Sequence, residues 1–164
     1  MARCLIIGCG CRGRALGRAL TIAGYTTRGT TRDPGNRGQI EAAGAEPFIG
    51  DPNLVGTLAG AFDHVSVACI LLGSAVGSAE QVTALHGSRL EMLLARMLDT
   101  TVRGVVYEAA GSVDPAVLRA GASILRAVCE RSSIPYVWLV ADPRHHAAWL
   151  DAAGDAVERL LGAL

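Results

Sequence analysis

The sequence of 164 residues contains no lysine, so all 15 of its basic residues are arginine. It has 15 acidic residues as well, which gives a formal net charge of zero, and only 18% of the chain is charged. A neutral chain gives no electrostatic argument for binding nucleic acid or an anionic membrane surface. The missing lysine also excludes any catalytic scheme in which a lysine ammonium lowers the pKa of a neighbouring group.

Long hydrophobic runs are missing too. The longest uncharged stretch, residues 65–79, contains glycine and serine and falls short of the roughly 18 residues that a membrane span needs. The first apolar run, residues 4–7, is too short for the core of a secretory signal. Five cysteines, an odd number, favour a reducing compartment. We therefore expect a cytoplasmic protein with one domain spanning residues 1–164.

Short strand-like segments alternate with helical patterns along the whole chain. Several segments, such as "VSVACILL", are almost continuously apolar, as strands buried on both faces are. The pattern predicts an α/β fold, a Rossmann-type doubly wound parallel sheet of about six strands with helices on both faces. The strands are expected at residues 4–7, 25–30, 46–49, 64–71, 104–107 and 136–140.

A glycine turn follows the first predicted strand, in the pattern Gly8-x-Gly10-x-x-Gly13. Gly8 allows a tight turn, Gly10 lets the backbone approach a pyrophosphate, and Gly13 permits close packing of helix on strand. The helix that begins there, at about Gly13, presents unpaired N–H groups and a partial positive charge. The turn therefore predicts a dinucleotide site, and a strand-to-helix corner without a ligand is the alternative.

The second predicted strand is followed by Thr31-Arg32, where a fold selective for NAD usually has an acidic residue. An arginine beside small hydroxyls suits the 2′-phosphate of NADP, because guanidinium offers several donors and a permanent charge. Arg12 and Arg14 in the glycine turn are further candidates for that pocket. Asp33 keeps NAD as an alternative, and Arg32 as a solvated loop residue is the structural alternative.

Four segments together resemble the atypical short-chain dehydrogenase/reductases, the NmrA-like and sugar-epimerase-like group: "LIIGCGCRGRALGRAL", "GTTRDP", "GAEPFIGDPNLVGTLAGAFDHV" and "IPYVWLV". The resemblance implies that the three turn glycines bind the pyrophosphate and that Asp51 lies by the adenine. It also implies that Leu71 and Leu72 flank the adenosine ribose and the nicotinamide side. The full set of expected cofactor-binding residues is Gly8, Gly10, Cys11, Arg12, Gly13, Thr31, Arg32, Asp51, Leu71 and Leu72.

Departures from the family pattern concern catalysis. Catalytic members use a serine near the end of the fifth strand, where this chain has Ala109, and a Tyr-x-x-x-Lys motif on the next helix. Tyr107 is followed four residues later by Gly111, and the chain ends where family members continue into a substrate domain. We therefore expect an NADP(H)-binding or sensing module without an assigned catalytic residue. The alternatives are an NAD(P)-dependent oxidoreductase or epimerase-like enzyme with a non-standard site or partner subunit, and a structural interaction protein with a vestigial nucleotide site.

Several polar and aromatic residues outside the glycine turn are further candidates for a role in function or assembly. Glu108 is the best single candidate for a proton-handling carboxylate, with a helix-capping or solvated role as the alternative. His86 is expected at the surface, and His145 with His146 in a polar loop. The tail, which includes Trp149 and Leu150, is expected to leave apolar surface uncovered, which predicts a homodimer or a partner subunit.

Two cysteines stand in the glycine turn, Cys9 and Cys11. They lack a second pair of ligands at suitable spacing, so no metal site is predicted. Small side chains that fill the turn are the simplest interpretation. A redox-sensitive thiol, with a pKa lowered by the helix N-terminus, is the alternative.

Overall fold

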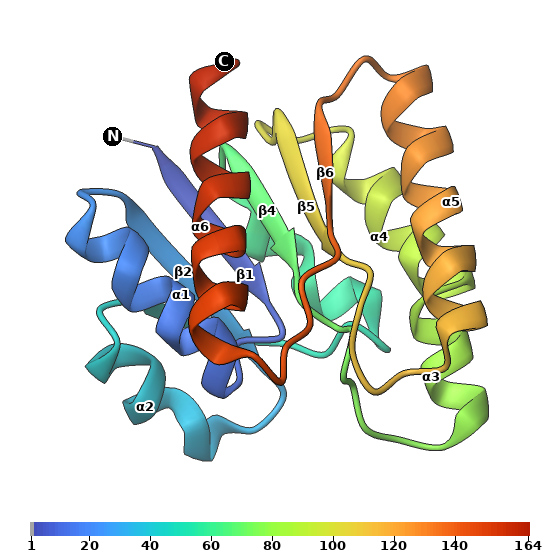
Figure 1. The fold of residues 1–164 in the computed structure, drawn as a ribbon, viewed down its shortest axis with the longest axis horizontal. Coiled ribbons are helices and arrows are strands. Elements are labelled where there is room, and N and C mark those ends of the chain that lie inside the picture. The colour runs from blue at the N-terminus through green and yellow to red at the C-terminus, as the bar shows by residue number, and fades with distance from the viewer. Residues whose placement is uncertain (1) are drawn as a thin grey trace.

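Six parallel strands form one sheet in the computed structural model, which describes residues 2–164. Their order across the sheet is β3-β2-β1-β4-β5-β6 (Figure 1). The chain thus builds one half of the sheet outward from β1 and then returns to build the other half from β4. This is the predicted doubly wound parallel sheet. The strands are β1 (Arg3–Ile7), β2 (Thr26–Thr31), β3 (Glu46–Ile49), β4 (Val67–Ile70), β5 (Gly104–Glu108) and β6 (Tyr136–Leu139).

Helices cover both faces of the sheet (Figure 1). One face carries α1 (Cys11–Ile22), α2 (Arg37–Ala42) and α6 (His146–Gly162). The other face carries α4 (Ser88–Met97), α5 (Pro115–Arg131) and the 3-10 helix η2 (Val55–Phe62). The short helix α3 (Ala79–Leu85) packs against α4, and the 3-10 turn η1 (Pro34–Asn36) precedes α2.

Strand residues divide alternately between two hydrophobic cores, because successive side chains of a strand point to opposite faces. In β1, Leu5 and Ile7 join the core under α4 and α5, whereas Cys4 and Ile6 join the core under α1 and α6. This explains why the central strands are apolar throughout.

Three details differ from the predictions. The helix α1 begins at Cys11, two residues before the expected start. The connection after β3 is a 3-10 helix and not an α-helix. The strand β4 is shorter than residues 64–71, because His64 turns the chain with a positive φ of 62° and pairing stops at Ile70.

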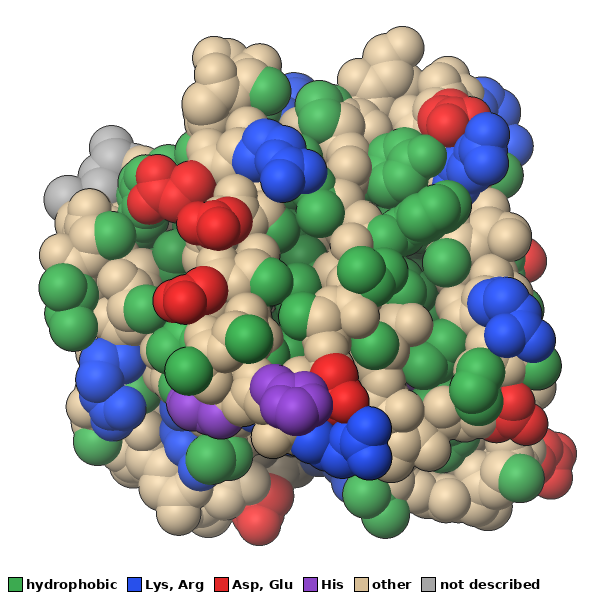
Figure 2. All heavy atoms as spheres, viewed as in Figure 1, with side chains coloured by type: hydrophobic (Ala, Val, Ile, Leu, Met, Phe, Trp, Pro, Cys, Tyr) green, Lys and Arg blue, Asp and Glu red, His purple; other side chains and the backbone are tan. Residues whose placement is uncertain are grey.

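The expected uncovered surface at Trp149 is wrong. Its side chain is 0% exposed and belongs to the core under α6, and Leu150 packs against that core. The edge strand β6 exposes Trp138 instead, at 38%, and Val140, directly after the strand, is 72% exposed. Figure 2 shows hydrophobic side chains along the region between α6 and α5, where Figure 1 places β6. Within residues 2–164, no helix is long and apolar enough to cross a membrane.

Candidate functional site

A cleft lies where the winding of the sheet changes direction. The strands β1 and β4 are neighbours, but the chain leaves β1 toward β2 and leaves β4 toward β5, so their following loops diverge. Ligands of doubly wound sheets bind in the crevice that this divergence opens at the carboxyl ends of the strands. Here the crevice is a cleft of about 300 Å³, lined by the glycine turn, the ends of β2 and β3, and the loop after β4.

The three glycines of the turn meet different steric demands. Gly8 has a φ of +86°, and a Cβ there would lie 2.5 Å from the carbonyl oxygen of Leu71, so only glycine fits. A Cβ on Gly13 would lie 2.9 Å from the Gly8 carbonyl oxygen, which shows the close packing of helix on strand. A Cβ on Gly10 would meet nothing within 4 Å. The space above Gly10 is therefore open on the side of the cleft.

Helix α1 begins at this turn without a side-chain cap. Gly10 is its N-cap residue, and the first turn contains no acidic residue. No N-cap side chain and no acidic residue of the first turn therefore satisfies the terminal N–H groups or the positive end of the helix dipole. An anionic group in the cleft would meet this requirement.

The end of β2 presents one unpaired cation. The Thr31 hydroxyl accepts hydrogen bonds from the Asp33 N–H (3.2 Å) and the Asn36 side-chain amide (3.3 Å), so it holds the loop together. The Asp33 carboxylate accepts from the Gly35 N–H at 2.8 Å and caps η1. Arg32 is exposed, lines the cleft and has no ion pair with any residue from 2 to 164. Asn36, which the sequence analysis did not single out, also lines the cleft.

Most of the residues expected to bind cofactor line this one cleft. Cys11 and Gly13 do not: Cys11 is exposed on α1, and Gly13 is buried beneath the turn. Arg14 does not line it either. The Asp51 carboxylate accepts from the Asn53 N–H at 2.8 Å, which orders the loop after β3. The lining residues that the sequence predicted are Gly8, Gly10, Arg12, Thr31, Arg32, Asp51, Leu71 and Leu72.

Cys9 is buried and packs against β2. Its N–H donates to the Thr30 carbonyl at 3.1 Å, and a Cβ on Gly29 would lie 2.5 Å from its sulfur. Burial raises the pKa of the Cys9 thiol to about 11. The alternative of a thiol with a lowered pKa is therefore wrong for Cys9, which fills space in the turn. Among residues 2–164 no group of three or more His, Cys, Asp or Glu side chains could hold a metal ion.

A second cavity, of about 750 Å³, adjoins the cleft at the carboxyl ends of β5 and β6. Arg12 and Ser74 line both spaces, so the two are neighbours at that point. Arg12 lies with its guanidinium carbon 5.9 Å from the centre of the Trp149 ring. Ala109, at the position where the family resemblance implies a serine, also lines this cavity.

Glu108 lines neither cavity and is 1% exposed. One oxygen accepts from the Gly73 N–H and the other from the Trp149 indole N–H, each at 2.9 Å. Burial raises the pKa of this carboxyl, and its two hydrogen bonds and Arg12 oppose the rise. Glu108 is therefore neither solvated nor a helix cap. Its buried carboxylate links β5 to the loop after β4 and to α6 through hydrogen bonds.

His86 is also buried, at 1% exposed, so the expected surface position is wrong. One ring nitrogen, Nε2, lies 2.8 Å from the Leu72 carbonyl oxygen, and the other, Nδ1, lies 2.5 Å from the Tyr107 hydroxyl. Because a carbonyl only accepts, Nε2 carries the hydrogen, and Nδ1 then accepts from Tyr107. Burial lowers the pKa of His86, which favours this neutral form. Gly121 leaves room for the Tyr107 hydroxyl, which a Cβ would overlap.

Comparison with known proteins adds the fold relationship. The sequence matches no protein-family model and no curated protein. Solved structures do match. A short-chain dehydrogenase/reductase superfamily protein from Agrobacterium tumefaciens with bound NAD is 20% identical, with a TM-score of 0.69 over 83% of this chain and 48% of that one. The chain shares the doubly wound Rossmann fold of this structure.

Two further structures agree. Triphenylmethane reductase from Citrobacter sp., complexed with NADP(H), is 19% identical, with a TM-score of 0.62 over 84% of this chain and 48% of that one. UDP-glucuronic acid 4-epimerase from Bacillus cereus, in complex with NAD, is 14% identical, with a TM-score of 0.66 over 83% of this chain and 54% of that one. The chain thus spans about half the length of these structures.

Proposed function

We propose that the protein binds NADP(H) in the cleft between β1 and β4 and acts as a cofactor-binding or sensing module, one domain of residues 1–164. The observation that carries this proposal is the unpaired Arg32, which lines the same cleft as the uncapped start of α1. A dinucleotide carries anionic groups at two places, the pyrophosphate and, in NADP, the 2′-phosphate. The cleft offers a positive group for each.

In this proposal, different residues of the cleft bind different parts of the cofactor. The open space over Gly10 lets the pyrophosphate approach the N–H groups of α1, and Gly8 and Gly13 make the turn sterically feasible. Arg32 pairs with the 2′-phosphate, while Asp51, Leu71 and Leu72 lie beside the adenosine and the nicotinamide side. Asp33 does not line the cleft and caps η1, which favours NADP over the alternative, NAD. The solved structures of the same fold include one with NAD and one with NADP(H).

Bound NADPH would supply a hydride, but residues 2–164 do not form the Ser-Tyr-Lys set that exchanges a proton beside it in the family that the sequence resembles. Ala109 replaces the expected serine, and lysine is missing from the sequence. Tyr107 donates to His86, and burial raises the pKa of its phenol. We therefore expect no turnover of simple ketones or aldehydes by the protein alone.

An oxidoreductase or epimerase-like enzyme is the second candidate, supported by the second cavity beside the cleft. It would need a non-standard site or a partner subunit. Oxidation of NADPH, followed by absorbance with a panel of carbonyl compounds, separates the two candidates. Robust turnover would favour the enzyme. A structural interaction protein with a vestigial nucleotide site remains the third candidate, and it predicts no cofactor binding at all.

Assembly and location follow from other features. The exposed apolar residues Trp138, on the edge strand β6, and Val140, directly after it, support a homodimer or partner subunit. Light scattering at tens of micromolar would test this. The five cysteines are free, which suits a reducing compartment, and we propose the cytoplasm.

Thermal unfolding tests the proposed function. A ligand that binds only the folded state stabilises it by about 2.7 kcal/mol at 100 times its Kd. NADPH should therefore raise the melting temperature of the purified protein. A melting temperature unchanged by both NADPH and NADH at millimolar concentration would contradict the proposal and favour the vestigial site.

A further inference from the structure

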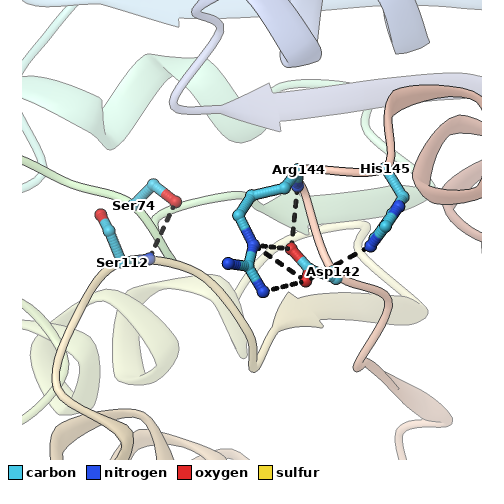
Figure 3. Close-up of polar contacts among 5 residues, drawn as sticks. All are labelled: Ser74, Ser112, Asp142, Arg144 and His145. Carbon is cyan, nitrogen blue, oxygen red and sulfur yellow. Dashed lines mark hydrogen bonds and ion pairs between the residues drawn. The ribbon is translucent and has the colours of Figure 1, made fainter.

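The second cavity has an excess of positive charge. Three arginines line it, Arg12, Arg119 and Arg144, against a single carboxylate, Asp142. Arg144 neutralises that carboxylate with hydrogen bonds of 2.8 and 3.0 Å to one of its oxygens (Figure 3). The His145 ring lies 3.8 Å from the same oxygen. The Arg144 partner also holds the pKa of Asp142 down, at about 2, so the pair stays ionised near neutral pH.

The other two arginines lack such a partner. Arg119 is exposed near the start of α5, and its guanidinium has no hydrogen bond or ion pair with any residue from 2 to 164. Arg12 lies over the Trp149 ring, and the nearby carboxylate of Glu108 already accepts two N–H bonds. The cavity therefore presents guanidinium donors that the protein leaves unsatisfied.

The wall between these arginines is held in place by the backbone. The Gly73 carbonyl accepts from the Val113 N–H at 3.0 Å, and the Ser74 hydroxyl oxygen accepts from the Ser112 N–H at 3.2 Å. Figure 3 shows this serine pair beside Arg144 and Asp142. These contacts join the loops after β4 and β5. The remaining walls are apolar, from Ala109, Leu118 and Val140.

We propose that the second cavity binds a small organic carboxylate. Arg119 and the outer side of Arg144 hold its carboxylate group, and the apolar walls hold its carbon body. Guanidinium pairs with carboxylates through two parallel hydrogen bonds. The apolar walls and the volume of about 750 Å³ favour an organic ion over inorganic phosphate. Only the placement of this ligand beside the nicotinamide rests on the proposed function, because the cavity's own residues bind the carboxylate.

Calorimetric titration tests the proposal with pyruvate, malate, succinate, 2-oxoglutarate and benzoate as probes, each with and without saturating NADP. At least one probe should bind with a Kd below about 1 mM. Its methyl ester and inorganic phosphate should bind at least about tenfold more weakly. Failure of every probe, or phosphate binding as tightly as the best carboxylate, would overturn the proposal.

Three variants locate the ion. Arg119→Gln should weaken the best probe about tenfold or more, since it removes a charged donor. Arg126→Gln, on the exposed side of the same helix and paired with Glu130, should leave binding unchanged. Asp142→Asn keeps the oxygen that accepts from the Arg144 N–H and removes a negative charge, so it should tighten binding severalfold. Equal affinities in wild type and Arg119→Gln would overturn the assignment.

The same titrations separate this proposal from the proposed function. Arg119 does not line the cofactor cleft, so NADPH should bind wild type and Arg119→Gln alike. Carboxylate binding without NADPH binding would contradict the cofactor proposal and support this one. NADPH binding without carboxylate binding would support the cofactor proposal and contradict this one.

Discussion

The carboxyl ends of β2 and β5 lie on the same edge of the sheet, but their polar side chains differ in exposure and in hydrogen bonding. After β2, Arg32 is exposed, unpaired within the described chain and directed to the cleft. At the end of β5, Glu108 and Tyr107 are buried and bonded to Trp149, Gly73 and His86. The arrangement after β2 leaves the Arg32 donors available to a ligand. At the end of β5, the polar groups form hydrogen bonds within the protein.

Under the proposed function, this contrast would explain how the protein binds a dinucleotide without catalysing a reaction on it. A catalytic group must reach the reacting atoms, whereas the polar groups of β5 stabilise the packing of β4, β5 and α6. A buried donor left without an acceptor costs about 1–3 kcal/mol. Moving Glu108 or Tyr107 into a catalytic position would therefore lower the stability of the fold. The substitutions below test each side of the comparison.

Glu108→Ala should have the largest effect. It leaves the Gly73 N–H and the Trp149 indole N–H without their acceptor, so the free energy of unfolding should fall by about 2–6 kcal/mol. Urea denaturation of the purified variant measures this loss. Glu130→Ala is the matched control, because Glu130 is an exposed carboxylate paired with Arg126. It should change the unfolding free energy by less than about 1 kcal/mol. If Glu108→Ala has the same free energy of unfolding as this control, the Glu108 carboxylate does not stabilise the fold.

A pair of glycine substitutions separates folding from binding in the cleft. Gly8→Ala places a Cβ against the Leu71 carbonyl at a positive φ and should cost about 1–3 kcal/mol of stability. Gly10→Ala adds a methyl group to open space and should cost less than about 1 kcal/mol. It should nevertheless weaken NADPH binding, because the methyl group occupies the approach of the pyrophosphate. Urea denaturation and NADPH titration of both variants check this, and undiminished NADPH affinity in Gly10→Ala would contradict the assigned approach.

The buried His86 predicts a smaller, pH-dependent effect. Its pKa is lowered in the folded protein, so as the pH falls the unfolded chain takes up the proton first. The free energy of unfolding should therefore decline below about pH 6.5, by at most about 1.4 kcal/mol per pH unit from this residue. The raised pKa of Glu108 contributes with the opposite sign and stays in place when His86 is replaced.

Urea denaturation between pH 7.5 and 5.5 isolates the contribution of His86. His86→Gln should flatten the decline relative to wild type. His146→Gln, at an exposed histidine on α6, is the matched control. Parallel pH profiles for wild type and His86→Gln would contradict a buried neutral imidazole.

The sequence predicted the cleft well because its signals are local. A positive φ at Gly8, close packing at Gly13 and the parallel strand order all follow from short-range pattern and from connection rules. Eight of the ten expected cofactor residues line one cleft for the same reason. Their binding roles remain predictions.

The β5 side could not be predicted because its partners are distant in sequence. Glu108 meets Gly73 and Trp149, which are 35 and 41 residues away along the chain. Nothing in the sequence around His86 shows that Tyr107 and Leu72 would enclose it. Gly121 makes room for the Tyr107 hydroxyl. The sequence alone does not show this role, because it depends on how α5 packs against β5.

Calorimetric titration of wild type and Arg32→Ala with NADPH and NADH tests the central claim most directly. A charge-assisted hydrogen bond contributes about 1.5–3 kcal/mol, which is roughly tenfold to 150-fold in affinity. Wild type should prefer NADPH by at least about tenfold. Arg32→Ala should lose most of that preference while its NADH affinity stays unchanged, and Arg37→Ala on α2 should behave as wild type. Equal NADPH affinity in wild type and Arg32→Ala would contradict the claim that Arg32 reads the 2′-phosphate.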